Sequence, residues 1–227
     1  MELTIIWRFL VRVWTSLSGF LFRKARKGIK HVSTALSAEE VQISEQAAFL
    51  CQKYIEARFT RSELCFFNPK SRKNERLDSS ATCSEDVIKT LCEVGTLLEN
   101  SYPKLYINVL EQLNFRINLG ILVCHMFNRV SENIIASGIN WGRIVAVYAF
   151  AGALAYDFTQ AGDTRFIRNV SGWMGRFCAR RLSPWIRQNG GWEGLVSHFK
   201  EEERSVMNSF SKWLKRNQPR LKQKPGE

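Results

Sequence analysis

Apolar residues in most of the chain recur every three or four positions, and no useful length alternates apolar and polar residues as a strand would. This spacing predicts helices over 38–59 and 84–100, the second ending before Pro103. Residues 104–137 have the same period and predict two helices. The polar stretch at about 67–83 predicts a long, exposed, mobile loop between the first two helices.

A stretch near the middle, residues 144–156 (IVAVYAFAGALAY), is apolar on every side and contains thirteen uncharged residues. A membrane-spanning helix needs about 20 residues, so this stretch predicts a helix buried inside a bundle. Asn140 is expected to cap this helix, because a side-chain oxygen at the residue before a helix accepts one of its free backbone N–H groups.

Further helices are predicted toward the C-terminus. Asp163 is expected to cap a helix over 164–182, and Ser183 is expected to cap a short helix with Pro184 at its first position. An amphipathic helix is predicted at about 201–215. We therefore expect an all-α fold, a single bundle of about eight or nine helices around one central apolar helix.

The composition, 45% hydrophobic and 24% charged, is that of a globular protein and excludes a disordered or fibrous chain. The net charge of +12 is concentrated at the ends. Residues 1–31 have seven basic and one acidic residue, residues 212–227 have six and one, and the 180 residues between them have 20 and 19. Because a nucleic-acid-binding domain usually has its basic stripe on the folded body, we expect no nucleic-acid partner, and such a protein is only a distant alternative.

Basic ends on a neutral body fit attraction to an acidic membrane surface. Residues 3–22 place arginines on one narrow helix face and aromatic and aliphatic residues on the opposite face, as in helices that lie in a membrane interface. A targeting segment and a helix docked on the domain's own core are alternatives. The expected membrane contacts are Trp7, Arg8, Arg12 and Trp14. We divide the chain into a basic amphipathic segment (1–31), a helical domain (32–215) and a polar basic tail (216–227).

Motifs for catalysis and for metal or cofactor binding are missing from the sequence. The six cysteines lack zinc-site spacing, and most lie in apolar helical surroundings where a free thiol acts as a small hydrophobic group. The sequence contains no glycine-rich phosphate loop and no nucleophile elbow, and its three histidines are scattered. We therefore expect a non-enzymatic protein without a metal or another cofactor.

Two longer motifs are similar to those of a known family. Residues 138–150 (GINWGRIVAVYAF) and 184–192 (PWIRQNGGW) resemble the first and second homology motifs of the Bcl family (B-cell lymphoma two). Members of this family regulate apoptosis at the mitochondrial outer membrane. The resemblance covers about residues 36–214, and it implies a helical bundle with a surface hydrophobic groove.

The family's third homology motif is a helix with four apolar residues on one face, a small residue and an acid. The corresponding residues here are Val87, Leu91, Val94, Gly95 and Leu98. Thr96 stands where the family has an aspartate after the glycine. Since a charge-assisted hydrogen bond contributes about 1.5–3 kcal/mol, its loss predicts a helix that is a weak ligand for other family members.

The resemblance assigns a groove that receives homology-motif helices from other family members. Val130 and Ile134 would form its floor, with Ala146 and Phe150 on the opposite wall. The alternative is that these four apolar side chains are simply part of the core.

The first motif supplies the polar edge of that groove. Arg143 would pair with the acid of an incoming helix, because its planar guanidinium binds a carboxylate through two hydrogen bonds. Its alternative is an intramolecular ion pair. Gly142 would let the ligand helix approach closely, and Asn140 would both cap the central helix and bind the ligand. The tryptophans of the two motifs are expected to pack at helix ends. The second-motif residues are Trp185, Gly190, Gly191 and Trp192, and Trp141 belongs to the first motif.

The direction of action is left open by the resemblance. Residues 47–59 and 102–113 look like the pro-death ovarian-killer (Bok) branch, whereas residues 140–143 look more like pro-survival members. We predict a Bok-like pro-apoptotic role, with a guardian that sequesters pro-death members as the alternative. Expected partners are homology-motif helices, a membrane surface and homo- or hetero-oligomers. The expected location is the cytosol and intracellular membranes, first the mitochondrial outer membrane and second the endoplasmic reticulum.

Overall fold

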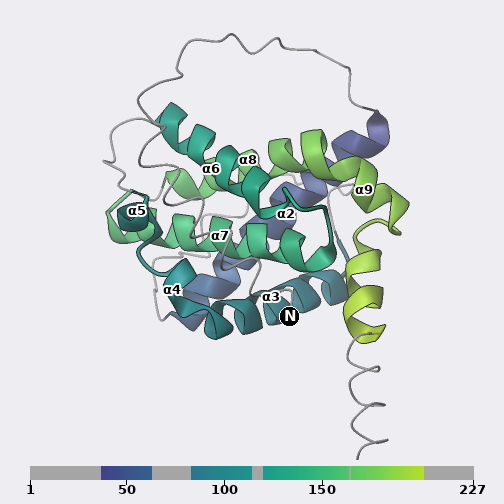
Figure 1. Cartoon of the computed structure of the whole chain (residues 1–227), viewed down its shortest axis with the longest axis horizontal. Helices are drawn as coiled ribbons and strands as arrows, with labels where there is room; N and C mark the ends of the chain where they lie inside the picture. The colour runs from purple at the N-terminus through teal and green to yellow at the C-terminus, as the bar shows by residue number, and fades with distance from the viewer. Residues whose placement is uncertain (1–36, 63–82, 114–119, 164, 202–227) are drawn as a thin grey trace, which may run out of the picture.

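A computed structural model describes residues 37–62, 83–113, 120–163 and 165–201 (Figure 1). Outside these residues lie most of the predicted loop, the C-terminal tail and the predicted membrane contacts Trp7, Arg8, Arg12 and Trp14.

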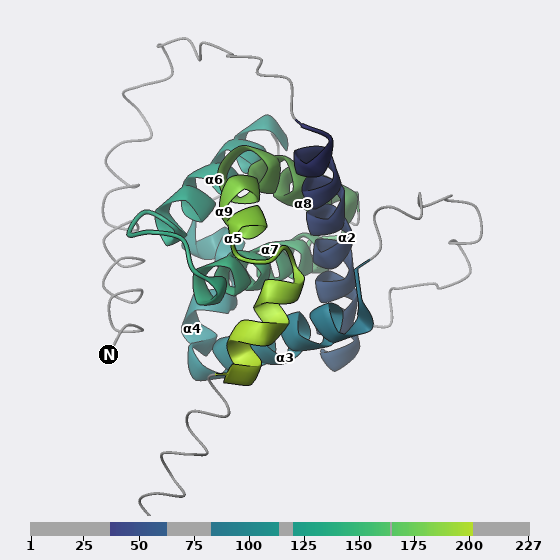
Figure 2. The same ribbon diagram turned by 90° about the vertical axis from the view of Figure 1, so that its right-hand side faces the viewer.

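The described residues form an all-α bundle without a strand, which confirms the predicted fold class. The helices are α2 (Ala38–Arg61), α3 (Glu85–Ser101), α4 (Pro103–Tyr106), α5 (Val109–Gln112), α6 (Gly120–Ile134), α7 (Trp141–Gln160), α8 (Phe166–Phe177) and α9 (Ser183–Gln188). A π-helical turn, η3 (Cys178–Leu182), joins α8 to α9, and residues 193–201 are also helical. In Figures 1 and 2, α6 and α8 lie on one side of α7, and α3 and α4 lie on the other.

The central helix is α7, which packs against α2, α3, α5, α6 and α8. Fifteen of its twenty residues are buried, which confirms the prediction of a buried apolar helix. Each large apolar side chain buried in this way contributes on the order of 1.5–3 kcal/mol relative to exposure. Within the described part of the chain, no helix is both long enough and apolar enough to cross a membrane.

Side-chain caps explain where three of the helices begin. Ser37 accepts a hydrogen bond from the Glu40 backbone at 3.2 Å, and the Glu40 carboxylate accepts one from the Ser37 N–H at 2.8 Å. Ser84 accepts from the backbone of the third residue of its helix in the same way. Asn140 accepts from the Arg143 N–H at 2.8 Å, which confirms the predicted cap of the central helix.

The prediction of two helices over 104–137 was wrong in its first half. Two one-turn helices, α4 and α5, precede α6 there. Asn108 adopts the left-handed conformation (φ 51°), which ends one turn and starts the next. The Gln112 amide donates hydrogen bonds to the carbonyls of Lys104 and Ile107, at 2.8 and 2.6 Å, and so replaces helical hydrogen bonds of this segment.

The two caps predicted after the central helix are also corrected. The Asp163 carboxylate accepts hydrogen bonds from the Arg165 N–H and guanidinium, at 2.9–3.2 Å, and α8 begins only at Phe166. The Ser183 hydroxyl donates to the Ala179 carbonyl at 2.8 Å and caps nothing. The reason is that the chain passes from α8 through η3 into α9 without a break, so α9 has no free N-terminus to cap.

The described cysteines are free thiols. Burial raises the pKa of Cys51 to about 12, so this thiol stays protonated and packs as a small apolar group. No group of three His, Cys, Asp or Glu residues in the described ranges could hold a metal ion.

The contact between α7 and α2 generates a stability prediction. A Cβ atom added at Gly152 would lie 2.9 Å from Cε1 of the buried Tyr54 ring, so Gly152→Ala should lower the free energy of unfolding by about 1–3 kcal/mol, measured by urea denaturation. Gly172→Ala on α8 is the matched control. The nearest atom there is the flexible Arg176 Nη1 at 3.5 Å, so helix propensity should leave that variant as stable as the wild type or more stable. Equal losses in the two variants would contradict this account of the contact.

Candidate functional site

The motifs at 138–150 and 184–192 meet through their tryptophans. The Trp141 ring lies 5.1 Å from that of Trp185 and 6.2 Å from that of Trp192, centroid to centroid. Gly190 and Gly191 have φ values of 84° and 64°, a conformation that favours glycine, and they turn the chain so that Trp192 packs back on α7. The predicted helix-end packing of these tryptophans is confirmed.

The start of α7 presents a polar edge. Nη1 of Arg143 donates to the Gly138 carbonyl at 2.8 Å, which uses one of its five donors. Among the described residues, no carboxylate lies within ion-pair distance of Arg143, so its intramolecular pairing is with a backbone carbonyl. Gly142 beside it is exposed, and a Cβ there would contact only Asn140 Oδ1, at 3.6 Å. This edge therefore has unused donors and little steric hindrance.

The four apolar residues assigned to the groove lie on two neighbouring helices. Val130 and Ile134 on α6 are 6% and 8% exposed, and Ala146 and Phe150 on α7 are 2% and 6% exposed. The Phe127 ring stacks on Phe150 with centroids 5.8 Å apart. The structure therefore places these side chains in packed surroundings, and an open groove at this place stays a prediction.

The third-motif helix, α3, turns its motif face toward the core. The buried motif residues are Val87, Leu91 and Gly95. The partly buried ones are Val94 and Leu98. Thr96, at the position of the family's aspartate, donates its hydroxyl to the Cys92 carbonyl of its own helix at 2.6 Å. The motif face is thus used for internal packing.

The ring of Tyr54 on α2 lies between a glycine of α3 and a glycine of α7. A Cβ added at Gly95 of α3 would lie 2.4 Å from Cε2 and from the hydroxyl oxygen of Tyr54, and one at Gly152 of α7 would lie 2.9 Å from Cε1 of the same ring. The small residue of the third motif therefore makes room for Tyr54, which lies between α3 and α7.

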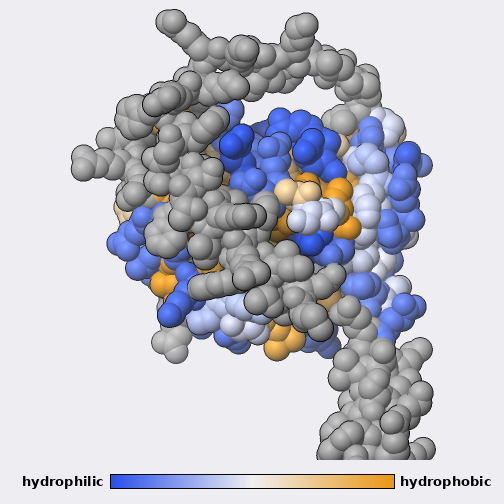
Figure 3. All heavy atoms as spheres, in the orientation of Figure 1, coloured by the Kyte–Doolittle hydropathy of each residue, from blue (hydrophilic) through white to orange (hydrophobic). Residues whose placement is uncertain are grey.

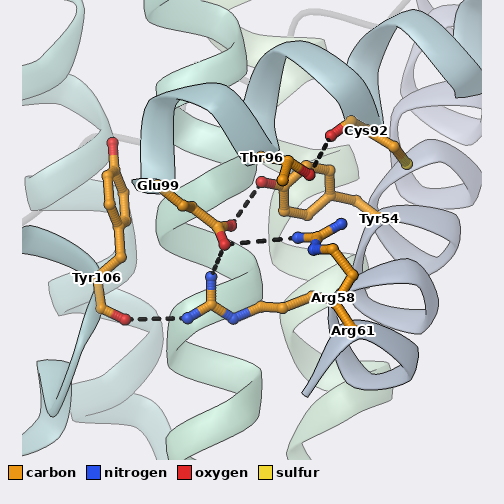
Figure 4. A network of polar contacts seen from close by, with 7 residues as sticks. All are labelled: Tyr54, Arg58, Arg61, Cys92, Thr96, Glu99 and Tyr106. Carbon is orange, nitrogen blue, oxygen red and sulfur yellow. Dashed lines mark hydrogen bonds and ion pairs between the residues drawn. The ribbon is translucent and has the colours of Figure 1, made fainter. Parts of the chain in front are cut away.

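A polar network continues from this ring (Figure 4). The Tyr54 hydroxyl donates to Glu99 Oε1 at 2.6 Å. The other oxygen of Glu99 pairs with Arg58, and it also pairs with Arg61 at 3.5 Å. Arg58 Nη2 donates to the Tyr106 carbonyl at 3.0 Å. We call these five residues the Glu99 network, and they join α2 to α3 and α4.

The Glu99 network is largely shielded from water. The side chains of Arg58 and Glu99 are only 10% and 13% exposed. Burial, reinforced by the charge of Glu99, raises the pKa of Tyr54 far above its usual value, so the phenol stays protonated and keeps donating. The Arg58 guanidinium also lies 5.6 Å from the centre of the Tyr156 ring on α7. One carboxylate thus compensates two arginines in a low-dielectric environment.

Sequence reasoning did not find this network. The available signal was an arginine on an apolar helix face, since Cys51, Tyr54, Ile55 and Arg58 recur at helical spacing. A buried arginine requires a carboxylate partner, but the spacing does not say which acid supplies it.

Removing the shared carboxylate should be costly. Glu99→Gln would leave two arginines without their counter-charge, one of them buried, and we expect it to lower the free energy of unfolding by about 3 kcal/mol. Glu93→Gln on the exposed face of α3 should change it by less than about 0.5 kcal/mol, because its ion pair with Lys89 is exposed. The measurement is urea denaturation followed by circular dichroism, and similar values for the two variants would refute a central role for Glu99.

Comparisons with known proteins identify the family of this chain. A family model described as "Apoptosis regulator proteins, Bcl-2 family" matches residues 91–192. The Bcl-2-related ovarian killer protein homolog B of Danio rerio is 31% identical over 174 residues, which cover 72% of this chain and 81% of that protein.

Two solved structures have the same fold. The solution NMR structure of human BOK has a TM-score of 0.60 and 28% identity, covering 70% of this chain and 99% of that chain. The crystal structure of Trichoplax adhaerens trBcl-2L2 bound to trBak BH3 has a TM-score of 0.57 and 28% identity, with the same coverage. With its two motifs joined at α7 and these relatives, the chain belongs to the Bcl-2 family of apoptosis regulators.

Proposed function

We propose that this protein is a Bok-like pro-apoptotic regulator that binds homology-motif helices of other family members at the start of α7. The observation that carries this proposal is the partly exposed Arg143, which pairs with no described carboxylate and lies next to the exposed Gly142. An incoming helix with an acid on its apolar stripe would supply the missing counter-charge. The Trichoplax relative, which was solved with a BH3 ligand, supports this mode of binding.

The apolar part of the site would lie between α6 and α7. A ligand helix would contact Val130 and Ile134 on one side and Ala146 and Phe150 on the other. Because these side chains are packed, binding requires α6 to move away from α7, so that the ligand replaces contacts such as the Phe127–Phe150 stack. Asn140 and Trp141 would keep the α7 N-terminus in place during this movement through the cap and the tryptophan cluster.

The protein is proposed to receive such helices more readily than it donates its own. The Thr96 hydroxyl is bonded within α3 and offers no charge to another protein's arginine. In addition, the Glu99 network would have to break before α3 could leave the domain. Both features oppose self-association by exchange of the third motif.

A second candidate function is a guardian that sequesters pro-death helices. It is favoured by residues 140–143, whose sequence looks like that of pro-survival members, and by the same network that keeps α3 in the bundle. For either function we propose action at intracellular membranes, with the mitochondrial outer membrane first and the endoplasmic reticulum second. Residues 1–31 would then contribute membrane contacts, and homo- or hetero-oligomers would form there.

The role of Arg143 can be measured with a labelled homology-motif peptide that contains the acid. Arg143→Ala should weaken binding more than tenfold in fluorescence anisotropy, because a charge-assisted hydrogen bond to the acid of the peptide is lost. Arg165→Ala is the control, since this exposed arginine follows the opposite end of α7, which is about 30 Å long. Unchanged affinity of the Arg143 variant, with circular dichroism equal to wild type, would remove Arg143 from the site.

The direction of action can be measured by dye release from liposomes of mitochondrial lipid composition. For a Bok-like effector we expect the full-length protein alone to release the dye. If it releases none and instead suppresses release by an added pore-forming family member, the guardian function replaces the proposal. Heat-denatured protein is the control for non-specific lysis.

A further inference from the structure

The near-neutral body of this protein has its charges separated along the chain. Residues 165–188, which cover α8, η3 and α9, contain six arginines and no lysine, aspartate or glutamate. Residues 83–113, which cover α3 to α5, contain five acidic and two basic residues. One part of the bundle is therefore strongly basic and another is acidic, although their sum is small.

Four of these arginines follow one line along α8 and η3. Arg165, Arg168 and Arg176 are spaced at i, i+3 and i+11, which is one face of a helix, and Arg180 follows one turn later. All four are exposed, whereas the opposite face of α8 is buried. We call these four residues the arginine stripe. From Arg165 to Arg180 it extends about 22 Å, at about 1.5 Å per residue.

The arginines differ in how far they are already neutralised. Arg165 binds Asp163 through two hydrogen bonds, and next to the stripe Arg181 lies 4.0 Å from Glu132. Arg176 has no ion pair with a described carboxylate, and Arg180 donates only to the neutral amide of Asn128, at 2.9 Å. Arg176 and Arg180, the C-terminal half of the stripe, are therefore not neutralised by a described carboxylate.

The helix that carries most of the stripe and the acidic helix lie on opposite sides of α7. In Figures 1 and 2, α8 lies with α6 on one side of α7, and α3 lies on the other side. Figure 3 shows hydrophilic residues gathered over α6 and α8.

We propose that the arginine stripe is a docking surface for an anionic membrane, with lipid phosphate and carboxylate groups as its ligands. An array of exposed guanidinium groups along about 22 Å fits a surface that presents many anions, whereas a phosphopeptide pocket brings its arginines together at one point. Arginine is suited to this because its guanidinium keeps its positive charge at every physiological pH. The proposal rests on the membrane part of the proposed function and is independent of the groove.

Docking through the stripe would also orient the protein. With α8 against the membrane, the acidic α3 side faces away from the negatively charged lipid, so attraction and repulsion favour the same orientation. The third-motif helix and the Glu99 network would then face the aqueous phase.

The test uses full-length protein and phosphatidylcholine vesicles with and without phosphatidylserine, in a flotation assay. Since each basic residue near such a surface contributes about fivefold in affinity, Arg176→Gln with Arg180→Gln should weaken binding about 25-fold on anionic vesicles only. The matched control is Lys89→Gln with Lys104→Gln, which removes two exposed positive charges from α3 and α4. It should change binding less than about twofold.

Three outcomes would overturn the proposal. The first is equal binding of the wild type and the arginine variant, and the second is an equal loss in the lysine control. The third is arginine-dependent binding of poly-glutamate together with unchanged vesicle binding, which would indicate an acidic protein partner instead.

Two further comparisons separate a membrane surface from a discrete phosphate site. Arg176→Lys with Arg180→Lys should bind vesicles within about threefold of wild type, because a surface array requires charge more than the guanidinium fork. Inorganic phosphate should compete no better than chloride of equal ionic strength. Because binding and dye release are separate readouts, a protein that binds through the stripe but releases no dye would contradict the effector function and leave this inference standing.

Discussion

The carboxylate of Glu99 is the constraint on which the arrangement of the other helices depends. It accepts a hydrogen bond from the Tyr54 hydroxyl and forms ion pairs with Arg58 and Arg61. A single side chain of α3 therefore satisfies three polar side chains of α2. Without it, the Arg58 guanidinium would lie beneath α3 with no carboxylate partner, and a buried unpaired charge costs several kcal/mol. Tyr54 can reach Glu99 only because Gly95 and Gly152 leave room for its ring. The third-motif helix is therefore retained by polar contacts as well as by its apolar face.

This arrangement connects stability with function. A regulator of this family can use α3 as a ligand only if the helix leaves the bundle, and here departure would expose Val87 and Leu91 and break the Glu99 network together. By contrast, the proposed receipt of a helix at α7 would require changes between α6 and α7, on the other side of the central helix from α3. The two movements use different contacts. Opening the proposed receiving site would therefore not require α3 to be released, and this agrees with the proposal that the protein keeps its own third motif.

Local features of the fold could be predicted from the sequence, and long-range pairings could not. The buried α7 and its Asn140 cap follow from an uninterrupted apolar stretch and one polar residue before it, and both are confirmed. The turn at Asn108 escaped prediction because helical period alone does not reveal a left-handed residue. Glu99 is 45 residues from Tyr54, so no local pattern could identify the pair. For the groove, spacing places Val130 and Phe150 on helix faces, but whether those faces are open or packed depends on the whole bundle.

Net charge illustrates the same difference between local and overall properties. A body with 20 basic and 19 acidic residues suggests that charge acts only through the basic ends of the chain. Folding, however, places the α8–α9 segment, which has no acidic residue, and the acidic α3 on opposite sides of α7. This separation produces an electrostatic field that the net charge of the body does not reveal. Exposed charges closer than a Debye length, about 8 Å in physiological salt, act together, whereas the far side of the bundle is screened. A membrane in contact with α8 would therefore interact mainly with the arginine stripe, and the small net charge of the body would not prevent binding.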